Sequence, residues 1–130
     1  MKRTPLRKSS KKTPAQLKKI LWKHFSLYIR TRDKGICFTC GRRAEGGGYH
    51  AGHFISKAVG GLALYFHEEN VKGQCYNCNI NLGGNSYIFG EKLGKKKVKD
   101  LYKLKQVIVK NFPFEEKISE YKEKLSKLPL

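Results

Sequence analysis

The chain has 130 residues, about the length of one domain, which excludes an enzyme with a separate substrate domain. It carries 28 Lys and Arg against 10 Asp and Glu, and the formal net charge of +18 indicates a polyanion as partner. Hydrophobic residues make up 39%, so the core is thin and a bound metal would help to stabilise it. Because we find neither a bilayer-spanning apolar run nor a secretory signal, we expect a cytoplasmic protein without membrane contact.

Residues 1–34 hold most of the positive charge. They carry twelve Lys and Arg and one acidic residue, a net charge of +11, whereas residues 35–110 carry twelve and five, a net charge of +7. Residues 111–130 carry four of each and are neutral. Residues 1–12 hold six cations without an apolar period, so we expect a disordered basic arm there.

A helix is predicted to begin at residue 13 or 14. Thr13 can cap it, Pro14 suits its first position, and Gln16 completes the spacing of a capping box. Apolar side chains then recur at helical spacing until Gly35 ends the helix, and we interpret this stripe as core. Its members are Leu17, Ile20, Leu21, Trp22, Phe25, Tyr28 and Ile29.

Four cysteines form two C-x-x-C pairs separated by 34 residues. They are Cys37, Cys40, Cys75 and Cys78. Two such pairs can close a tetrahedral zinc site. Two disulfides or redox C-x-x-C motifs are the alternatives, but a lysine-rich chain without a signal favours zinc. A zinc bound by four thiolates has no open position, so we expect it to hold the fold and to perform no chemistry.

Between the two pairs, the pattern predicts strand, loop, strand and helix, and thus a small α+β fold. Glycines at 46–48 and 60–61 mark a turn and a loop. The strands are residues 49–55 and 70–74, and the helix begins near residues 75–78 with an interruption at 83–84.

Two further helices are predicted downstream. The first has a stripe of Val98, Leu101, Tyr102, Lys105, Ile108 and Val109 and is closed by Pro113. The second has an apolar side of Ile118, Tyr121, Leu125 and Leu128, which either folds back on the domain or forms a homodimer. The chain is therefore divided into the arm (1–12), a zinc-bound domain with a leading helix (13–110) and a C-terminal amphipathic helix (111–130).

His50, His53, Asn70 and Asn79 could carry chemistry within this frame. Hydrolysis of a phosphodiester with one metal needs a general base for water and a cation that neutralises the leaving oxygen. An imidazole supplies the base near neutral pH, and a second imidazole with an amide oxygen could hold the cation. Asn79 follows Cys78 directly, so the zinc would fix its position. Either histidine alone would be read as a loop residue without a role; the pair beside Asn79 favours a site.

These residues make the chain similar to a known family. It resembles the phage lambda NinG (Rap) family of recombination endonucleases, within the HNH or His-Me finger superfamily, over about residues 20–105. The resemblance rests on the helix at 21–30, the first cysteine pair with Gly41, the block 50–55, and the pairs Asn70-Val71, Gln74-Cys75, Cys78-Asn79 and Gly84-Asn85. It implies a zinc-stapled ββα-metal core.

The resemblance also implies roles. His53 matches the general base, Asn70 the residue that braces the loop, and Asn79 the metal ligand on the helix. His50 stands where related resolvases, such as endonuclease VII, place a metal-binding carboxylate. His50 and Asn79 would then hold a catalytic Mg²⁺ or Mn²⁺; magnesium prefers oxygen ligands, whereas an imidazole also suits manganese.

Groups of cations are the candidates for sequence-independent contacts to DNA phosphates. They are Lys2, Arg3, Arg7, Lys8, Lys11, Lys12, Arg42, Arg43, Lys57, Lys95, Lys96 and Lys97. No side chain indicates base readout, and the resemblance implies branched DNA such as Holliday junctions or D-loops.

We therefore expect a structure-selective, metal-dependent DNA endonuclease that acts in phage recombination, in the bacterial cytoplasm if it is phage-encoded. The alternative is a non-catalytic zinc protein that binds DNA as a recombination accessory or regulator. Charge and zinc support both, and only His50, His53 and Asn79 favour the enzyme, because a pure binder needs no base beside a metal site.

Overall fold

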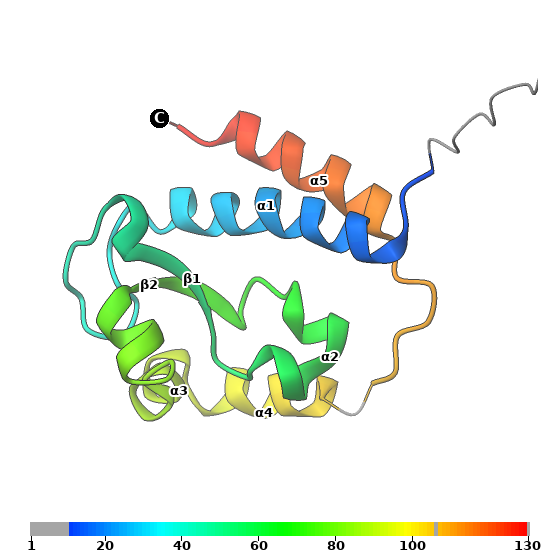
Figure 1. Cartoon of the computed structure of the whole chain (residues 1–130). Coiled ribbons are helices and arrows are strands. Elements are labelled where there is room, and N and C mark those ends of the chain that lie inside the picture. Colours follow the sequence, from blue (N-terminus) through cyan, green and yellow to red (C-terminus); the bar gives the residue numbers. More distant parts are fainter. Residues whose placement is uncertain (1–10, 106, 130) are drawn as a thin grey trace, which may run out of the picture.

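The computed structural model describes residues 11–105 and 107–129, so most of the predicted basic arm lies outside the described residues. Its elements are α1 (Pro14–Arg32), η1 (Gly46–Gly48), β1 (Tyr49–His53), α2 (Lys57–Tyr65), β2 (Val71–Cys75), η2 (Asn77–Asn81), α3 (Ser86–Leu93), α4 (Lys95–Leu104) and α5 (Phe114–Lys127). Figure 1 shows α1 and α5 side by side on one side of the β1–β2 hairpin, with α2, α3 and α4 on the other. The predicted small α+β class is confirmed.

The helix α1 begins at the predicted capping box. The N–H of Gln16 donates to the Thr13 hydroxyl at 3.2 Å, and the N–H of Thr13 donates to the Gln16 side chain at 2.8 Å. The helix ends at Arg32, before the predicted end at Gly35. There Asp33 pairs with Arg32 at 2.6 Å and accepts the N–H of Gly73 at 2.7 Å. The end of α1 is thereby joined to β2.

The two strands pair antiparallel, with Tyr49 opposite Cys75 and His53 opposite Val71. The first strand ends two residues earlier than predicted, and the second is shifted by one residue toward the C-terminus. The register places His50 opposite Gln74 and Tyr49 opposite Cys75, so the two candidate histidines share one hairpin with the first cysteine of the second pair.

Two apolar clusters surround the hairpin. In the first, Phe25 of α1 meets Tyr121 of α5 with ring centroids 4.9 Å apart. Its buried members are Leu21, Phe25, Ile29, Ala51, Phe66, Val71, Ile118 and Tyr121. The second cluster joins α2, α3 and α4 through Ile55, Leu64, Phe89, Leu93 and Leu101. Because Ile118 and Tyr121 are buried against α1, α5 folds back on the chain; a homodimer stays a prediction.

The predicted loop at Gly60-Gly61 is wrong, because residues 57–65 form α2. Gly61 has φ +71° and interrupts the helix with a kink, a conformation that glycine adopts without strain. Gly60 is buried, and a Cβ there would lie 2.9 Å from the Leu64 side chain. The glycine pair thus allows a bent helix that packs closely.

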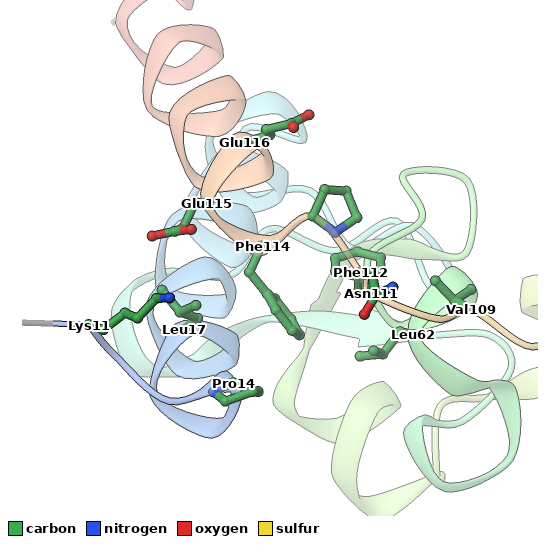
Figure 2. Close-up of a pocket in the computed structure, with 11 residues that line it drawn as sticks. Lys11, Pro14, Leu17, Leu62, Val109, Asn111, Phe112, Phe114, Glu115 and Glu116 are labelled. Carbon is green, nitrogen blue, oxygen red and sulfur yellow. The ribbon is translucent and has the colours of Figure 1, made fainter. Parts of the chain in front are cut away.

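The predicted helix through Val109 is also too long. The helix α4 ends at Leu104, and the following segment crosses to the start of α5 (Figure 1). Ile108 is 83% exposed, whereas Phe112 packs on Phe66 with ring centroids 5.7 Å apart. With the starts of α1 and α5, this crossing forms a hollow of about 680 Å³. Figure 2 shows the side chains that line it.

None of the described helices combines the length and the hydrophobicity that crossing a bilayer requires.

Candidate functional site

The four cysteines converge, as their spacing predicted. Their sulfurs all lie within 4.8 Å of one another, and the sulfurs of Cys40 and Cys75 are 3.8 Å apart. A disulfide needs about 2.05 Å, so these are free thiols, whereas tetrahedral zinc with bonds of about 2.3 Å separates its sulfurs by about 3.8 Å. In each pair, the N–H of the second cysteine donates to the sulfur of the first at 3.4 Å. The cluster could hold a structural zinc.

Four sulfurs this close favour a bound cation. Burial raises the pKa of Cys40 to about 12, and the neighbouring sulfurs add to the rise. Burial also raises the pKa of Cys37, but hydrogen bonds, including the one from the Cys40 N–H, bring it down to about 6. A divalent cation would stabilise the thiolate form of all four.

His50 of β1 and Asn79 of η2 face each other. The Asn79 side-chain N–H₂ lies 2.9 Å from Nδ1 of His50. Nε2 of His50 is 2.9 Å from the carbonyl oxygen of Gly47, which can only accept. His50 therefore carries its proton on Nε2, and Nδ1 accepts from Asn79. Asn79 belongs to η2, a π-helical turn that the second cysteine pair holds, and such turns are frequent at functional sites.

His53 lies at the end of β1 in a more enclosed setting. Its ring stacks on Trp22 with centroids 5.3 Å apart, and Nε2 is 2.9 Å from the carbonyl oxygen of Tyr65. Nε2 must therefore carry the proton, and no hydrogen bond to Nδ1 is found within residues 11–105 and 107–129. Burial lowers the pKa of His53 to about 4, with a further contribution from Lys57, so the imidazole is neutral at pH 7. Nδ1 is available as a proton acceptor.

Asn70 is fully buried and connects the loop after β1 to α2. Its side-chain oxygen accepts the N–H of Ile55 at 2.8 Å, and its N–H₂ donates to the carbonyl oxygens of Ile55 and Leu64 at 3.0 and 2.9 Å. These bonds fix the loop that follows His53. Asn70 does not reach the space between the histidines and acts through the backbone.

Two shallow recesses of about 340 Å³ each open beside these side chains, and Asn79 and Lys57 line both. His50 lines one recess, together with Trp22 and Arg30 of α1. His53 lines the other, together with Gly83 and Gly84. The fold therefore brings His50, His53 and Asn79 around one surface, which also carries the positively charged side chains of Lys57 and Arg30. An anionic ligand fits this arrangement.

The other predicted phosphate contacts are spread over the surface. Lys2, Arg3, Arg7 and Lys8 lie outside the described residues, and the side chains of the remaining eight are exposed. Lys96 pairs with Asp100 at 3.1 Å and Lys97 with Glu69 at 3.3 Å, so part of the charge on α4 is balanced locally. Lys57 is the member that lies at the recesses.

Sequence reasoning missed Gln74, which supports the site from beneath. It is fully buried, and its N–H₂ donates to the Gly84 carbonyl at 2.9 Å and to Thr39 at 3.1 Å. Its oxygen faces Gly52, where a Cβ would lie only 1.9 Å away. Its place opposite His50 on the second strand was the available signal. The roles of Arg30 and Trp22 at the site were also missed. Both residues belong to α1, whose apolar stripe predicts only core packing.

Comparison with known families gives one finding. A family model described as Bacteriophage Lambda NinG protein matches residues 2–129. No curated protein and no solved structure matches the chain. The match extends over nearly the whole chain, including both cysteine pairs, the two histidines of β1 and Asn79. The chain therefore belongs to the bacteriophage lambda NinG protein family.

Proposed function

We propose that this protein is a divalent-cation-dependent endonuclease that hydrolyses phosphodiester bonds in branched DNA during phage recombination. Membership of the NinG family supports a recombination-related role. The order β1, β2 and η2, with His53 at the end of β1 and Asn79 on η2, supports a ββα-metal core stapled by zinc at the four cysteines. The net charge of +18 supports a nucleic acid as substrate.

One observation carries the proposal: the Tyr65 carbonyl fixes the proton of His53 on Nε2, and Nδ1 is left as an acceptor beside a recess shared with Asn79. A histidine that served only the core would have no need of an unengaged nitrogen beside cations. Stacking on Trp22 holds the ring in one orientation, which a general base requires.

The reaction follows from this geometry. A water in the recess gives a proton to Nδ1 of His53 while its oxygen bonds to phosphorus. The bond between phosphorus and the 3′ oxygen breaks, and that oxygen takes a proton from solvent, so the products carry a 5′-phosphate and a 3′-hydroxyl. Lys57 and Arg30, which line the recesses, hold the anionic phosphate near the base.

His50 and Asn79 would hold the divalent cation. Their facing nitrogen atoms are 2.9 Å apart, and rotation of the Asn79 amide would present its oxygen to His50 instead, so the pair fits a shared cation. When bound, such a cation neutralises charge on the phosphate and the leaving oxygen. The pair offers an imidazole and an amide without a carboxylate, which suits Mn²⁺ better than Mg²⁺.

The test is cleavage of end-labelled four-way junction, D-loop, linear duplex and single-stranded DNA with added Mn²⁺, added Mg²⁺ or neither. We expect cation-dependent cutting of the branched substrates. His53→Ala should cut about 100- to 10,000-fold more slowly and bind the junction with unchanged affinity. Tight junction binding without cleavage under every condition would refute the enzyme and favour a non-catalytic DNA-binding protein.

A further inference from the structure

The segment between Lys72 and Glu91 differs in chemistry from the rest of the chain. It contains no charged residue, although charged residues make up 29% of the sequence. It includes the end of β2, all of η2 and the start of α3, and thus Asn79. Its exposed side chains include aromatic, aliphatic and amide groups, in contrast to the lysines and arginines elsewhere. Such groups do not suit contacts to phosphate.

Three apolar side chains of this segment are half exposed beside Asn79. Tyr76 and Leu82 are each 52% exposed and Ile80 is 51% exposed. We call these three residues the apolar edge. Single exposed apolar residues need no explanation, but three within one turn at a candidate site indicate an interaction. The turn lies directly on the second cysteine pair, so its shape is fixed by the cluster and not by burial of these side chains.

Two members of the apolar edge, Tyr76 and Leu82, adjoin residues that line the recesses. The Tyr76 ring lies edge-on to His50 with centroids 5.8 Å apart, next to the recess that Arg30 lines. Leu82 precedes Gly83, which lines the recess of His53. A phosphate held by the cations of these recesses would therefore bring its neighbouring nucleosides to the apolar edge.

We propose that the apolar edge binds unstacked bases of branched DNA on either side of the scissile phosphate, an inference that rests on the proposed function. Every base has an apolar face that stacks on aromatic and aliphatic side chains, and a continuous duplex hides these faces. Branch points and loops expose them. Asn77 and Asn81 are exposed on the same turn; the Asn81 amide donates to the Asn77 oxygen at 3.1 Å, and their remaining donors and acceptors are open to base edges. The edge thereby provides selectivity for structure where the surrounding cations provide affinity.

The test compares binding to a four-way junction and to a duplex of matched sequence, by fluorescence anisotropy, in a full-length His53→Ala background that cannot cleave. The triple variant Tyr76→Ala, Ile80→Ala, Leu82→Ala should lose about tenfold of the preference for the junction and keep its duplex affinity. Ile108→Ala, which removes an apolar side chain that is 83% exposed away from the recesses, is the matched control. The fluorescence of a 2-aminopurine at the branch point should change when the parent binds and should not change when the triple variant binds.

An unchanged junction-to-duplex ratio in the triple variant would overturn the inference, even if the wild type cleaves junctions. If the triple variant loses its preference for the junction and the wild type cleaves no substrate, the inference is supported and the proposed nuclease activity is refuted. Zinc content and circular dichroism establish that the triple variant is folded. If it is not, the single variant Tyr76→Ala, with Tyr76→Phe as the conservative partner that should retain the ratio, decides the question in the same way.

Discussion

The layer of α1 and α5 and the cysteine-clamped segment, which we define as residues 36–43 and 75–85, are stabilised in different ways. Phe25 and Tyr121 are buried between the helices, so apolar packing holds that layer. In the clamped segment, large apolar side chains such as Tyr76 and Ile80 are half exposed, and four converging sulfurs take the place of a core. His53 stacks on the first region, and Asn79 belongs to the second. The candidate site therefore needs both.

Breaking the clamp should have the largest effect. Cys78→Ser, or removal of zinc by a chelator, should release η2 and abolish cleavage. The reason is that the fold loses the binding free energy of a structural zinc, on the order of 10 kcal/mol. The α1–α5 layer should keep its helices. Hydrogen exchange read by mass spectrometry, with zinc content measured in parallel, should show rapid exchange confined to the clamped segment. Normal cleavage by zinc-free protein would contradict the assignment.

A methyl group at Gly52 should displace side chains of the candidate site, where the two regions meet, and leave the four cysteines able to bind zinc. A Cβ there would lie 1.9 Å from the Gln74 oxygen and 2.9 Å from the Asn79 oxygen, so both side chains must move. We expect Gly52→Ala to bind zinc and to cleave about 100-fold more slowly, since small displacements at a site cost this much. Gly48→Ala, with no neighbour within 4 Å, is the control and should cleave normally. Equal single-turnover rates for both variants would contradict the role of Gly52.

Weakening the α5 attachment should affect stability and spare the site. The Glu68 carboxylate accepts from the Tyr121 hydroxyl at 2.7 Å and from Lys124 at 2.6 Å. Burial opposes ionisation of Glu68, but these hydrogen bonds and charges lower its pKa, so the stabilisation is present at neutral pH and is lost on acidification. Glu68→Gln should lower the free energy of unfolding by about 1–3 kcal/mol at pH 7. Urea denaturation measures this, and cleavage by the folded variant should be unchanged. An unaltered midpoint at pH 7 would show that the attachment is not stabilising.

The smallest effect is expected from pH near neutrality. His53 must be neutral to accept a proton, and burial lowers its pKa to about 4. The rate should therefore rise with pH through about 4 and change little between pH 6 and 8 as far as His53 is concerned. A pH–rate profile under single-turnover conditions checks this. An acid limb near 6.5, the ordinary value for histidine, would show that the ring is not buried as described.

The features that depend on a few residues at fixed spacing were predicted correctly from the sequence. The capping box at Thr13 and the convergence of Cys37, Cys40, Cys75 and Cys78 follow from spacing alone, because each depends on residues whose chemistry admits few partners. The pairing of the strands also follows, since the second cysteine pair must return to the first. His50 and Asn79 meet as this hairpin requires.

Tertiary contacts decided the rest. The helix α2 bends at Gly61, and beyond the bend the Leu64 carbonyl accepts from buried Asn70, a contact that no local pattern signals. The stripe through Val109 continues helical periodicity, but the chain must leave α4 to carry Phe112 and Phe114 into the first cluster. Likewise, the setting of His53 depends on Trp22, which is distant in sequence and was read as core.

The central claim is that His53 is the base held between the two regions. The direct test is single-turnover cleavage of a labelled four-way junction by His53→Ala with Mn²⁺, with and without added imidazole. Removing the ring leaves a space beside Trp22 and Tyr65 that imidazole can enter. The account predicts loss of cleavage that imidazole partly restores. Cleavage by His53→Ala at the wild-type rate would contradict it.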